Sequence, residues 1–547
     1  MHTQKEVFAM ESIADLTGAQ LVEGPAKETP QKVALIFNEQ RITYQELNQR
    51  ADALAAGFSE LGIKQGDRVL VCLPNCPEFV VAFFASMKLG AVHVGVSTRF
   101  RSRELKFMLQ NTRTSTLLIA EQYDGFNYLE LIKEVRQDTP LLKNIVVVNG
   151  RPEDGMMSFD RLIEAGKNKE YPKPEIDPQK DLATLVYTSG TTGFPKGAMH
   201  THSGFFGAAG LCVGRAEKLN SQDVVLGHIP MTVMFGAVIL CAAFYARASL
   251  VLIDTYNPKL VLELIEKEKV TEHSGTPAMF IMEMNHPDFK NYDITSLKVG
   301  IAAGAFFPTE LVKKADKEMG LKLVQALGTS ETVACALGSI EDSLDSRAET
   351  LGAPMPGSEI KVIDDSGKEL PLGEAGELYY RGWNLCQGYW ENPAENEKAF
   401  DDDGWWHTGD LVKIDEKGNV RILGRKKELI IRGGFNIVPS EIEELLSKHP
   451  KILEIAVVGT PNPVLGESIC VCAIPPKGQR PTLLELRDFL KDKIADYKLP
   501  DELAIMETFP YLANGKLAKF GPEGLESLAK ADETREKLIN IKSKKKQ

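Results

Sequence analysis

Helical and strand-like patterns of apolar residues alternate along most of this chain. Residues 44–61 have apolar residues at helical spacing and are followed by Gly62, a residue type that commonly ends a helix. Residues 67–73 form a strand-like run that stops at Pro74, and residues 79–89 return to helical spacing. Repeated strand-then-helix units predict a doubly wound α/β fold.

The pattern changes close to residue 425. Residues 419–424 resemble a strand, and a basic turn at residues 425–427 follows. Beyond this turn, short strand-like and helical runs are mixed, with strands expected at 455–459 and 469–474 and helices at 440–448 and 483–494. A segment of about 120 residues is long enough to fold by itself. We therefore expect a large α/β domain over residues 1–424 and a smaller α+β domain over residues 425–547.

Length and composition agree with two domains. The chain has 547 residues, and single cores stop growing at roughly 250–300 residues. The net charge of −12 argues against a general nucleic-acid surface. The eight cysteines are scattered, without a C-x-x-C pair or a zinc-like spacing, which favours reduced thiols in a cytoplasmic protein. The N-terminus lacks the apolar stretch of a secretion signal.

One apolar stretch is long enough to be considered as a membrane segment. Residues 229–246 carry no formal charge, which is at the edge of a spanning length. Pro230, Thr232 and Gly236 interrupt the stretch. We therefore expect a buried helix of a large α/β domain and no integral membrane segment.

The densest chemical motif spans residues 187–197, which read YTSGTTGFPKG. It follows an apolar run at residues 182–186 that predicts a buried strand. Hydroxyl and glycine N–H groups at a strand end form an anion cradle, and Lys196 adds a positive charge for phosphate. Pro195 and Gly197 stand where a Walker loop needs a glycine and a hydroxyl ligand of magnesium, so a metal ligand has to come from elsewhere. A solvated loop without a ligand is the alternative.

Residues 188–197 resemble the phosphate-loop signature of the acyl-adenylate-forming enzymes. This superfamily includes AMP-forming acyl-CoA synthetases, the adenylation domains of peptide synthetases and beetle luciferase. The resemblance implies a mobile C-terminal lid, the substrates ATP, a carboxylic acid and coenzyme A, and Mg²⁺. It also implies that nucleotide phosphates contact Thr188, Ser189, Gly190, Thr191, Thr192, Gly193 and Lys196.

Residues 325–332, which read QALGTSET, supply the missing metal ligand. Glu331 offers the oxygen ligand that Mg²⁺ prefers, and Ser330 can contact a phosphate oxygen. The family pattern has tyrosine where Leu327 stands, so the aromatic platform for adenine is lost here, while Gln325 remains available for the adenine edge. The resemblance also places Gly328 and Thr329 at the nucleotide. Without the other motifs, a helix N-cap would be the simpler interpretation.

Residues 404–410, which read GWWHTGD, resemble the ribose-binding motif of the family. A carboxylate can accept both ribose hydroxyls, and Asp410 takes this role. A turn with a surface aspartate is the alternative. The resemblance further implies that Arg425 contacts ribose or phosphate. It also implies that small residues let the backbone lie along adenine and substrate, namely Ala303, Gly304 and Ala305.

Residues 510–516, which read PYLANGK, resemble the motif that carries the adenylation lysine. An Asn-Gly turn would project Lys516 from the lid, although the turn by itself is unspecific. The family hinge corresponds to Lys427. The glycine loop that meets the pantetheine arm of coenzyme A corresponds to Gly433 and Gly434.

Residues 230–236 match a family segment that usually has histidine where Val233 stands. Together with Leu327, this replacement suggests an apolar acid site, which favours medium-chain or alicyclic acids. We expect the acyl pocket to involve Val233, Met234, Phe235, Ala303 and Leu327. His228 lies nearby and is included, although a lone histidine is more often structural.

The motifs together predict an AMP-forming acyl-CoA synthetase. Lys196, Glu331, Arg425 and Lys516 are the expected catalytic residues. Two other functions stay open: an adenylating enzyme that loads a carrier protein, and a nucleotide-binding sensor with a degraded site. The sequence leaves the oligomeric state open, with a homodimer as one option.

Overall fold

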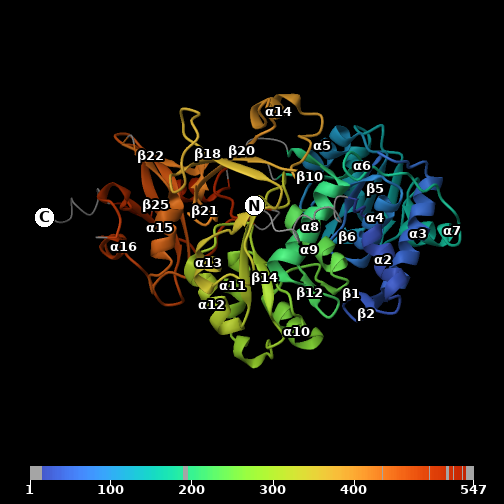
Figure 1. The fold of residues 1–547 in the computed structure, drawn as a ribbon, viewed down its shortest axis with the longest axis horizontal. Coiled ribbons are helices and arrows are strands. Elements are labelled where there is room, and N and C mark those ends of the chain that lie inside the picture. Colours follow the sequence, from blue (N-terminus) through green and yellow to red (C-terminus); the bar gives the residue numbers. More distant parts are fainter. Residues whose placement is uncertain are drawn as a thin grey trace.

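The computed structural model describes residues 15–188, 195–433, 435–491, 493–512, 516–521, 523–532 and 534–537, without the side chains of Val213 and Arg215. Figure 1 shows the N-terminal third of the chain at one end of the molecule and the C-terminal segment at the other. Several sheets with covering helices lie between them, as the alternating pattern predicts.

A seven-stranded sheet forms the N-terminal part of the molecule. Its strand order is β11-β10-β4-β3-β5-β8-β9, and every neighbouring pair is parallel except β10 with β11. The bounds are β3 Arg68–Cys72, β4 Val92–Gly95, β5 Thr116–Ala120, β8 Asn144–Val148, β9 Met157–Ser158, β10 Leu182–Tyr187 and β11 Gly197–Thr201. The predicted doubly wound α/β arrangement is confirmed.

Helices cover both faces of this sheet. Alternate residues of β3 point to opposite faces, so Val69 packs with α3 and α4 while Leu70 packs with α5 and α6. This is why the strands are apolar without interruption. The helices of this part are α2 Gln20–Glu28, α3 Tyr44–Glu60, α4 Pro77–Lys88, α5 Ser102–Thr112, α6 Tyr128–Arg136 and α7 Phe159–Gly166.

A second set of strands combines β1 and β2, which precede the seven-stranded sheet in the chain, with strands that follow it. Four strands have the order β2-β1-β13-β12, and isolated bridges of Glu272 connect β12 to β14. The order then continues as β14-β15-β16-β17. The strands are β1 Val33–Phe37, β2 Gln40–Thr43, β12 Val224–Gly227, β13 Ser249–Leu252, β14 Val299–Ala302, β15 Lys322–Leu327, β16 Ala336–Leu337 and β17 Ala353–Pro354. The helices here include α8 Ala208–Leu211, α10 Pro258–Glu268, α11 Pro277–Met284, α12 Thr309–Met319 and α13 Leu344–Glu349.

The uncharged stretch at residues 229–246 forms helix α9, Met234–Tyr245, which is buried in the main core. This confirms the expected buried helix. Among the described residues, no helix is long and apolar enough to cross a membrane.

An antiparallel meander leads toward the C-terminal segment. Its strands are β18 Glu359–Ile363, β19 Gly376–Arg381, β20 Trp406–Ile414 and β21 Val420–Arg425. Helix α14, Pro393–Ala399, lies between β19 and β20 in the chain. A single 3-10 turn, η4 Lys426–Glu428, follows β21 directly.

The segment after η4 builds a sheet and cores of its own. The strand order is β23-β22-β25-β26-β27, with β24 beside β25, and two apolar clusters draw only on residues from this segment. The elements are β22 Ile430–Arg432, β23 Phe435–Ile437, β24 Glu454–Asn462, β25 Gly466–Ile474, β26 Glu502–Ile505, β27 Glu536–Lys537, α15 Pro439–Leu446, α16 Leu483–Leu490 and α17 Leu525–Ala531. The expected helix at 483–494 is therefore shorter than predicted.

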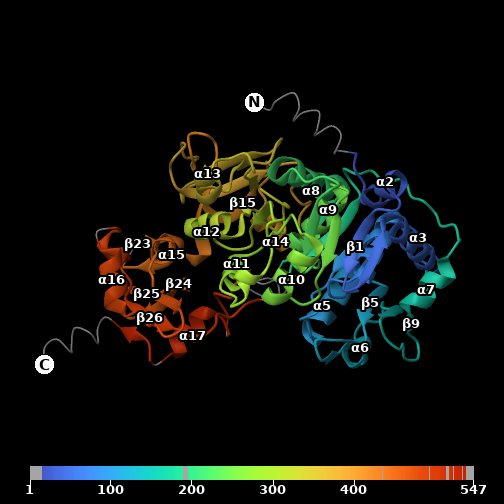
Figure 2. The same cartoon turned by 90° about the horizontal axis from the view of Figure 1, so that it is seen from below.

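Hydrogen bonds link this segment to the rest of the described chain. The backbone N–H of Thr309, at the start of α12, donates to Glu444 of α15 at 3.2 Å, and Figure 2 shows these two helices side by side. The Ser440 hydroxyl donates to the carbonyl oxygen of Leu423. The domain boundary at residue 425 stays a prediction.

Candidate active site

The phosphate-loop motif occupies the turn between the antiparallel strands β10 and β11. The Thr188 N–H donates to the carbonyl oxygen of Lys196 at 2.8 Å, and the Lys196 N–H donates to Thr188 Oγ1 at 3.3 Å. These two bonds fix the ends of the loop. The middle of the loop lies outside the described residues and includes Ser189, Gly190, Thr191, Thr192 and Gly193.

Lys196 has two partners at the base of this loop. Its ammonium forms an ion pair with Glu395 of α14, and it lies 5.0 Å from the centre of the Tyr389 ring. Hydrogen bonds from Lys196 and then Lys398 hold the pKa of Glu395 at about 2, so this carboxylate stays ionised. The Lys196 side chain is still 26% exposed, so a phosphate can reach the same ammonium.

Glu331 lies in the turn between β15 and β16 and is 9% exposed. The Tyr389 hydroxyl donates to Glu331 Oε1 at 2.8 Å. Tyr389 therefore contacts both Lys196 and Glu331, which are 135 positions apart in the numbering of the sequence. The sequence analysis did not identify this tyrosine as part of the site.

Strand β11 holds the two motifs together. Residues 387–390 extend along its free edge: the Gln387 N–H donates to Met199 O at 2.8 Å, and Tyr389 bridges Ala198. On the same strand, His200 Nε2 donates to the carbonyl oxygen of Ser330 at 2.7 Å. Burial lowers the pKa of His200 to about 4, so this imidazole is neutral and keeps a fixed hydrogen bond.

The turn beside Glu331 is strained. Val333 has a φ of 59°, which is unusual for a β-branched residue. Asn384, which is fully buried, spans the turn: its Nδ2 donates to Thr332 O at 2.6 Å and to Ala334 O at 2.8 Å. The Tyr380 hydroxyl donates to Asn384 Oδ1 at 2.6 Å and fixes the amide orientation. Asn384 thus stabilises the backbone that positions Glu331.

Asp410 and Arg425 face each other on the paired strands β20 and β21. Arg425 Nε donates to Asp410 Oδ1 at 2.9 Å, and the aspartate is 2% exposed. Burial raises the pKa of Asp410, while Arg425 and Lys516 oppose this effect. Among the described residues, Asp410 Oδ2 has no hydrogen-bond partner. An unpaired buried oxygen suits a hydroxyl donor such as ribose.

Lys516 lies among the residues of the other motifs, although residues 513–515 before it are outside the description. Burial lowers the pKa of Lys516, Arg425 lowers it further, and Asp410 and Glu331 raise it. Burial also lowers the pKa of Lys427, and Arg425 and Lys196 act in the same direction. The mutual influence of these charges groups Lys196, Arg425, Lys427 and Lys516 with the carboxylates of Glu331, Asp410 and Glu428.

Lys519 connects the Lys516 loop to the start of the C-terminal segment. Its Nζ lies 3.1 Å from Glu443 Oε1 and 3.2 Å from Glu428 Oε2. Burial disfavours the Lys519 ammonium, but Glu443 and Glu428 outweigh it and raise its pKa. Glu428 follows Lys427 directly, so this ion-paired group ties the loop of Lys516 to the predicted hinge.

The predicted adenine contacts lie on β14, β15 and the turns that follow them. Gly304 has a φ of 89°, a conformation that suits glycine. The Gln325 amide donates to the carbonyl oxygens of Arg347 and Ala348 at 3.1 and 2.7 Å. The N–H groups of this amide are therefore bonded within the protein. A contact of Gln325 with adenine stays a prediction, and it would have to use Oε1 as the acceptor. The positions Ala305, Leu327, Gly328, Thr329 and Ser330 flank these strands.

Four of the predicted acyl-pocket residues, Val233, Met234, Phe235 and Ala303, belong to the main apolar core or pack against it, and Leu327 packs against two smaller apolar clusters. Val233 caps α9 and lines a small cavity of about 10 Å³. Met234, Phe235, Ala303 and Leu327 are not among the residues that line it. His228 is buried instead beside His273 and Tyr256, at ring distances of 5.0 and 5.7 Å. Gly433, of the predicted glycine loop, lies in the β22–β23 turn with a φ of 59°, and Gly434 is outside the description.

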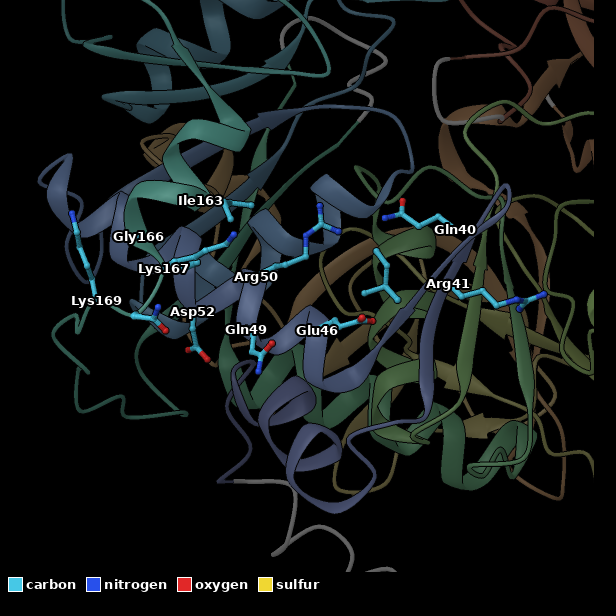
Figure 3. Close-up of a pocket in the computed structure, with 13 residues that line it drawn as sticks. Gln40, Arg41, Glu46, Gln49, Arg50, Asp52, Ile163, Gly166, Lys167 and Lys169 are labelled. Carbon is cyan, nitrogen blue, oxygen red and sulfur yellow. The ribbon is translucent and has the colours of Figure 1, made fainter.

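A larger pocket lies away from these motifs. It has a volume of about 590 Å³ and is lined by residues of β2, α3 and α7 and by the turn after α7. Figure 3 shows its mixed charges, which include Arg50, Asp52 and Lys169. None of the motif residues lines this pocket.

The donor set fits a magnesium ion that is held mainly by substrate. Among the described residues, no group of three or more His, Cys, Asp or Glu side chains could hold a metal. Glu331 offers one carboxylate, and one of its oxygens already accepts from Tyr389. Mg²⁺ typically takes one or two carboxylates and completes its shell with waters and substrate phosphates. Glu331 therefore fits as the protein ligand of a phosphate-bound ion.

Comparison with known proteins gives consistent matches. The family model for AMP-binding enzymes matches residues 22–390, and the model for the C-terminal domain of these enzymes matches residues 441–516. The human mitochondrial protein named medium-chain acyl-CoA ligase ACSF2 is 30% identical over 92% of this chain and 86% of its own. The Bacillus subtilis (strain 168) protein YngI, named as an acyl-CoA synthetase, is 33% identical over 93% of this chain and 97% of its own.

Solved structures are also similar. The anthranilate CoA ligase AuaEII in complex with anthranoyl-AMP has a TM-score of 0.85 and 27% identity, over 93% of this chain and 97% of that chain. ATP-bound MatB from Rhodopseudomonas palustris has a TM-score of 0.81 and 26% identity, over 92% of this chain and 98% of that chain.

The role of Asn384 can be tested by Asn384→Ala. Removing the amide leaves the carbonyl oxygen of Ala334 without its Asn384 donor, and the oxygen of Thr332 keeps only the bond from the Ala334 N–H. A buried acceptor that loses its donor costs about 1–3 kcal/mol of folding free energy. The strained turn then relaxes, and Glu331 loses its position. We expect the dissociation constant for ATP with Mg²⁺ to rise about ten-fold, as measured by calorimetry on the folded variant.

A second variant distinguishes the effect of the relaxed turn on ATP binding from a general loss of stability. Glycine adopts positive φ without strain, so adding Val333→Gly to Asn384→Ala should restore most of the ATP affinity. Unchanged ATP affinity in Asn384→Ala, measured at a temperature where the variant is folded, would show that Asn384 does not position Glu331.

Proposed function

The chain belongs to the family of AMP-binding enzymes, and on this premise we propose that it is an AMP-forming acyl-CoA synthetase for an apolar carboxylic acid. One observation carries the proposal: Lys516 of the C-terminal segment lies within electrostatic range of Glu331, Asp410 and Arg425 of the larger part. This brings together a candidate metal ligand, a ribose acceptor and two cations. The residue roles that follow are part of the proposal.

Activation of the acid begins with a repulsive encounter. The carboxylate oxygen attacks the α-phosphorus of ATP, the bond to the β-phosphate oxygen breaks, and pyrophosphate leaves with the electron pair. Two unit charges about 4 Å apart repel by roughly 4 kcal/mol at an effective dielectric constant near 20. Positioning and neutralising cations therefore have to provide most of the catalysis.

The charged residues have separate tasks in this step. Lys196 and the loop hydroxyls would hold the β- and γ-phosphates, and Lys516 would neutralise the bridging oxygens of the α-phosphate. Asp410 would accept the ribose hydroxyls through its unpaired Oδ2, while Arg425 pairs with Asp410 Oδ1 and would contact ribose or phosphate. A magnesium ion, when bound beside Glu331, supplies further neutralisation of the phosphates.

Thioester formation needs a different arrangement at the same site. The sulfur of coenzyme A attacks the acyl carbon, and AMP leaves with the oxygen that joined it to the acyl group. Lys516 would obstruct this attack, so the C-terminal segment has to move. We propose that it rotates about Lys427 and brings Gly433 and Gly434 to the pantetheine arm.

The acid is expected to be apolar and of medium chain length, or alicyclic. Val233 and Leu327 stand where the family pattern has histidine and tyrosine, which removes polar groups from the acyl site. The human relative is named as a medium-chain ligase, in agreement with this preference. The anthranilate ligase of similar structure shows that the fold also accommodates aromatic acids, so a graded acid panel is needed.

Lys516→Ala should separate the two half-reactions. Loss of the ammonium removes a charge that acts on the phosphates, so we expect acid-dependent pyrophosphate release to fall by at least about 100-fold. Conversion of a supplied acyl-adenylate with coenzyme A should stay within about three-fold of the unchanged protein. Single-turnover assays with each substrate set give the two rates.

A lysine of the same segment provides the control. Lys451 pairs with Glu485 at 2.6 Å and lies outside the cluster, so Lys451→Ala should leave both half-reactions unchanged. Equal loss of both half-reactions in Lys516→Ala would contradict the assignment of Lys516 to adenylation alone.

Lys427→Pro should have the opposite effect. Lys427 is the second residue of a 3-10 turn, and the fixed φ of a proline at this position opposes rotation. We expect adenylate formation to be retained and thioester formation to slow by at least about ten-fold. Lys427→Ala removes the side chain and keeps backbone freedom, so it should preserve the thioester step; a normal overall rate in Lys427→Pro would argue against a hinge at this residue.

A further inference from the structure

A small cavity lies between strands β4 and β10 and the start of helix α9. Its volume is about 10 Å³, roughly the space of one water-sized group. Most of its wall is apolar, including Phe83, Leu185, Phe205, Met231, Ala237 and Leu240. No Asp, Glu, Lys or Arg side chain is among the residues that line it.

One polar side chain in this wall has no partner. His93 of β4 is 3% exposed, and among the described residues neither of its ring nitrogens has a hydrogen-bond partner. Its ring packs edge-on against Phe79 and Phe83, at centroid distances of 5.3 and 5.0 Å. The nearby Thr184 hydroxyl donates to the backbone oxygen of His93 at 2.9 Å, so that hydrogen is not available to the cavity. A buried polar group without a partner is unfavourable unless a ligand or water completes it.

The protonation state of His93 restricts what can complete it. Burial lowers the pKa of His93 to about 3, so the ring is neutral near pH 7 and offers one N–H donor and one nitrogen acceptor. A hydroxyl group can both donate and accept, and it carries no charge. If the acid carried a second carboxylate or an ammonium at this end, that charge would be buried without a counter-charge in the cavity wall, which is costly.

The cavity also adjoins the predicted acyl site. Val233, the residue at the expected border of the acyl pocket, is part of the same wall. Gly95 lets the loop before α9 pack directly on β4, because a Cβ there would lie 2.9 Å from Thr232 Cα. The cavity thus shares Val233 with the predicted acyl site and has room for one small terminal group.

We propose that His93 recognises a neutral hydroxyl group at the far end of the acyl chain, so that the preferred acid has a hydrocarbon body and a terminal hydroxyl. This inference rests on the proposed acyl-CoA synthetase function and specifies its substrate class. His93 acts as a specificity-determining residue, and Val233 and Ala237 set the space in front of it.

The test compares paired acids on the full chain. Each pair consists of a saturated straight-chain acid and its terminally hydroxylated counterpart of equal length, over the medium-chain range. The measured quantity is kcat/KM for acid-dependent pyrophosphate release. At the length that reaches the cavity, the unchanged protein should prefer the hydroxylated acid by about ten-fold.

His93→Phe keeps an aromatic ring and removes its hydrogen-bonding nitrogens. We expect the preference to fall to about one or to reverse, whereas His93→Gln should retain part of it. His449 is the matched control, because it is also buried and packs edge-on against a phenylalanine, Phe489, at 5.0 Å. His449→Phe should leave the preference unchanged.

The outcomes distinguish the inference from the proposed function. If His93→Phe does not fold, Ala237→Leu fills the cavity from α9 and should abolish the preference without altering His93. Equal rates with both acids in the unchanged protein, or the same preference in His93→Phe, would overturn the inference and indicate that the cavity holds only a water molecule. No pyrophosphate release with any acid would instead contradict the proposed function.

Discussion

Repulsion between like charges is the constraint on which this site depends. A carboxylate has to approach a polyphosphate, and the protein that binds both carries a net charge of −12. Cations therefore have to be gathered locally, and the structure gathers Lys196, Arg425, Lys427 and Lys516 from three separate parts of the chain. Glu395 and Asp410 pair with two of these cations. By pairing with these cations, the carboxylates reduce the repulsion among the positive charges, which would otherwise oppose folding.

The scaffold of this cluster is a set of strand ends held in register. Strand β11 carries the phosphate-loop lysine at its start, receives residues 387–390 along its free edge, and contacts Ser330 through His200. Tyr389 then joins Lys196 to Glu331, and Asn384 braces the strained turn beside Glu331. The positions of Glu331 and Lys196 are therefore coupled. Lys519, three residues after Lys516, pairs with Glu428 and Glu443 of the C-terminal segment.

The parts of the fold that the sequence predicts are those with local causes. The apolar run before the phosphate loop, the helix over α3 and the buried helix α9 follow from periodicity and end signals that lie within each element. The charged site residues could be named because each stands in a short motif that resembles a known family pattern. Helix α16 ends earlier than its pattern suggests, which shows that element ends are less well determined than their existence.

Other features depend on contacts that no local pattern contains. Tyr389, Asn384 and His200 act through partners more than 50 positions away, so nothing near them in the sequence marks their roles. His93 appears as one polar residue inside an apolar strand, and only the packing of α9 and β10 around it reveals an unpaired imidazole beside a cavity. No local pattern determines the acyl site either: of its expected residues Val233 lines this cavity, and the pocket as a whole stays a prediction.

The central claim is that an acid is activated by transfer of AMP before any thiol takes part. The most direct measurement is the exchange of labelled pyrophosphate into ATP by the purified chain, with Mg²⁺ and an acid panel but without coenzyme A. The account predicts exchange that requires a carboxylic acid and occurs in the absence of the thiol, with AMP and acyl-CoA formed once coenzyme A is added. Exchange that is absent with every acid, or products consisting of ADP and phosphate, would contradict it.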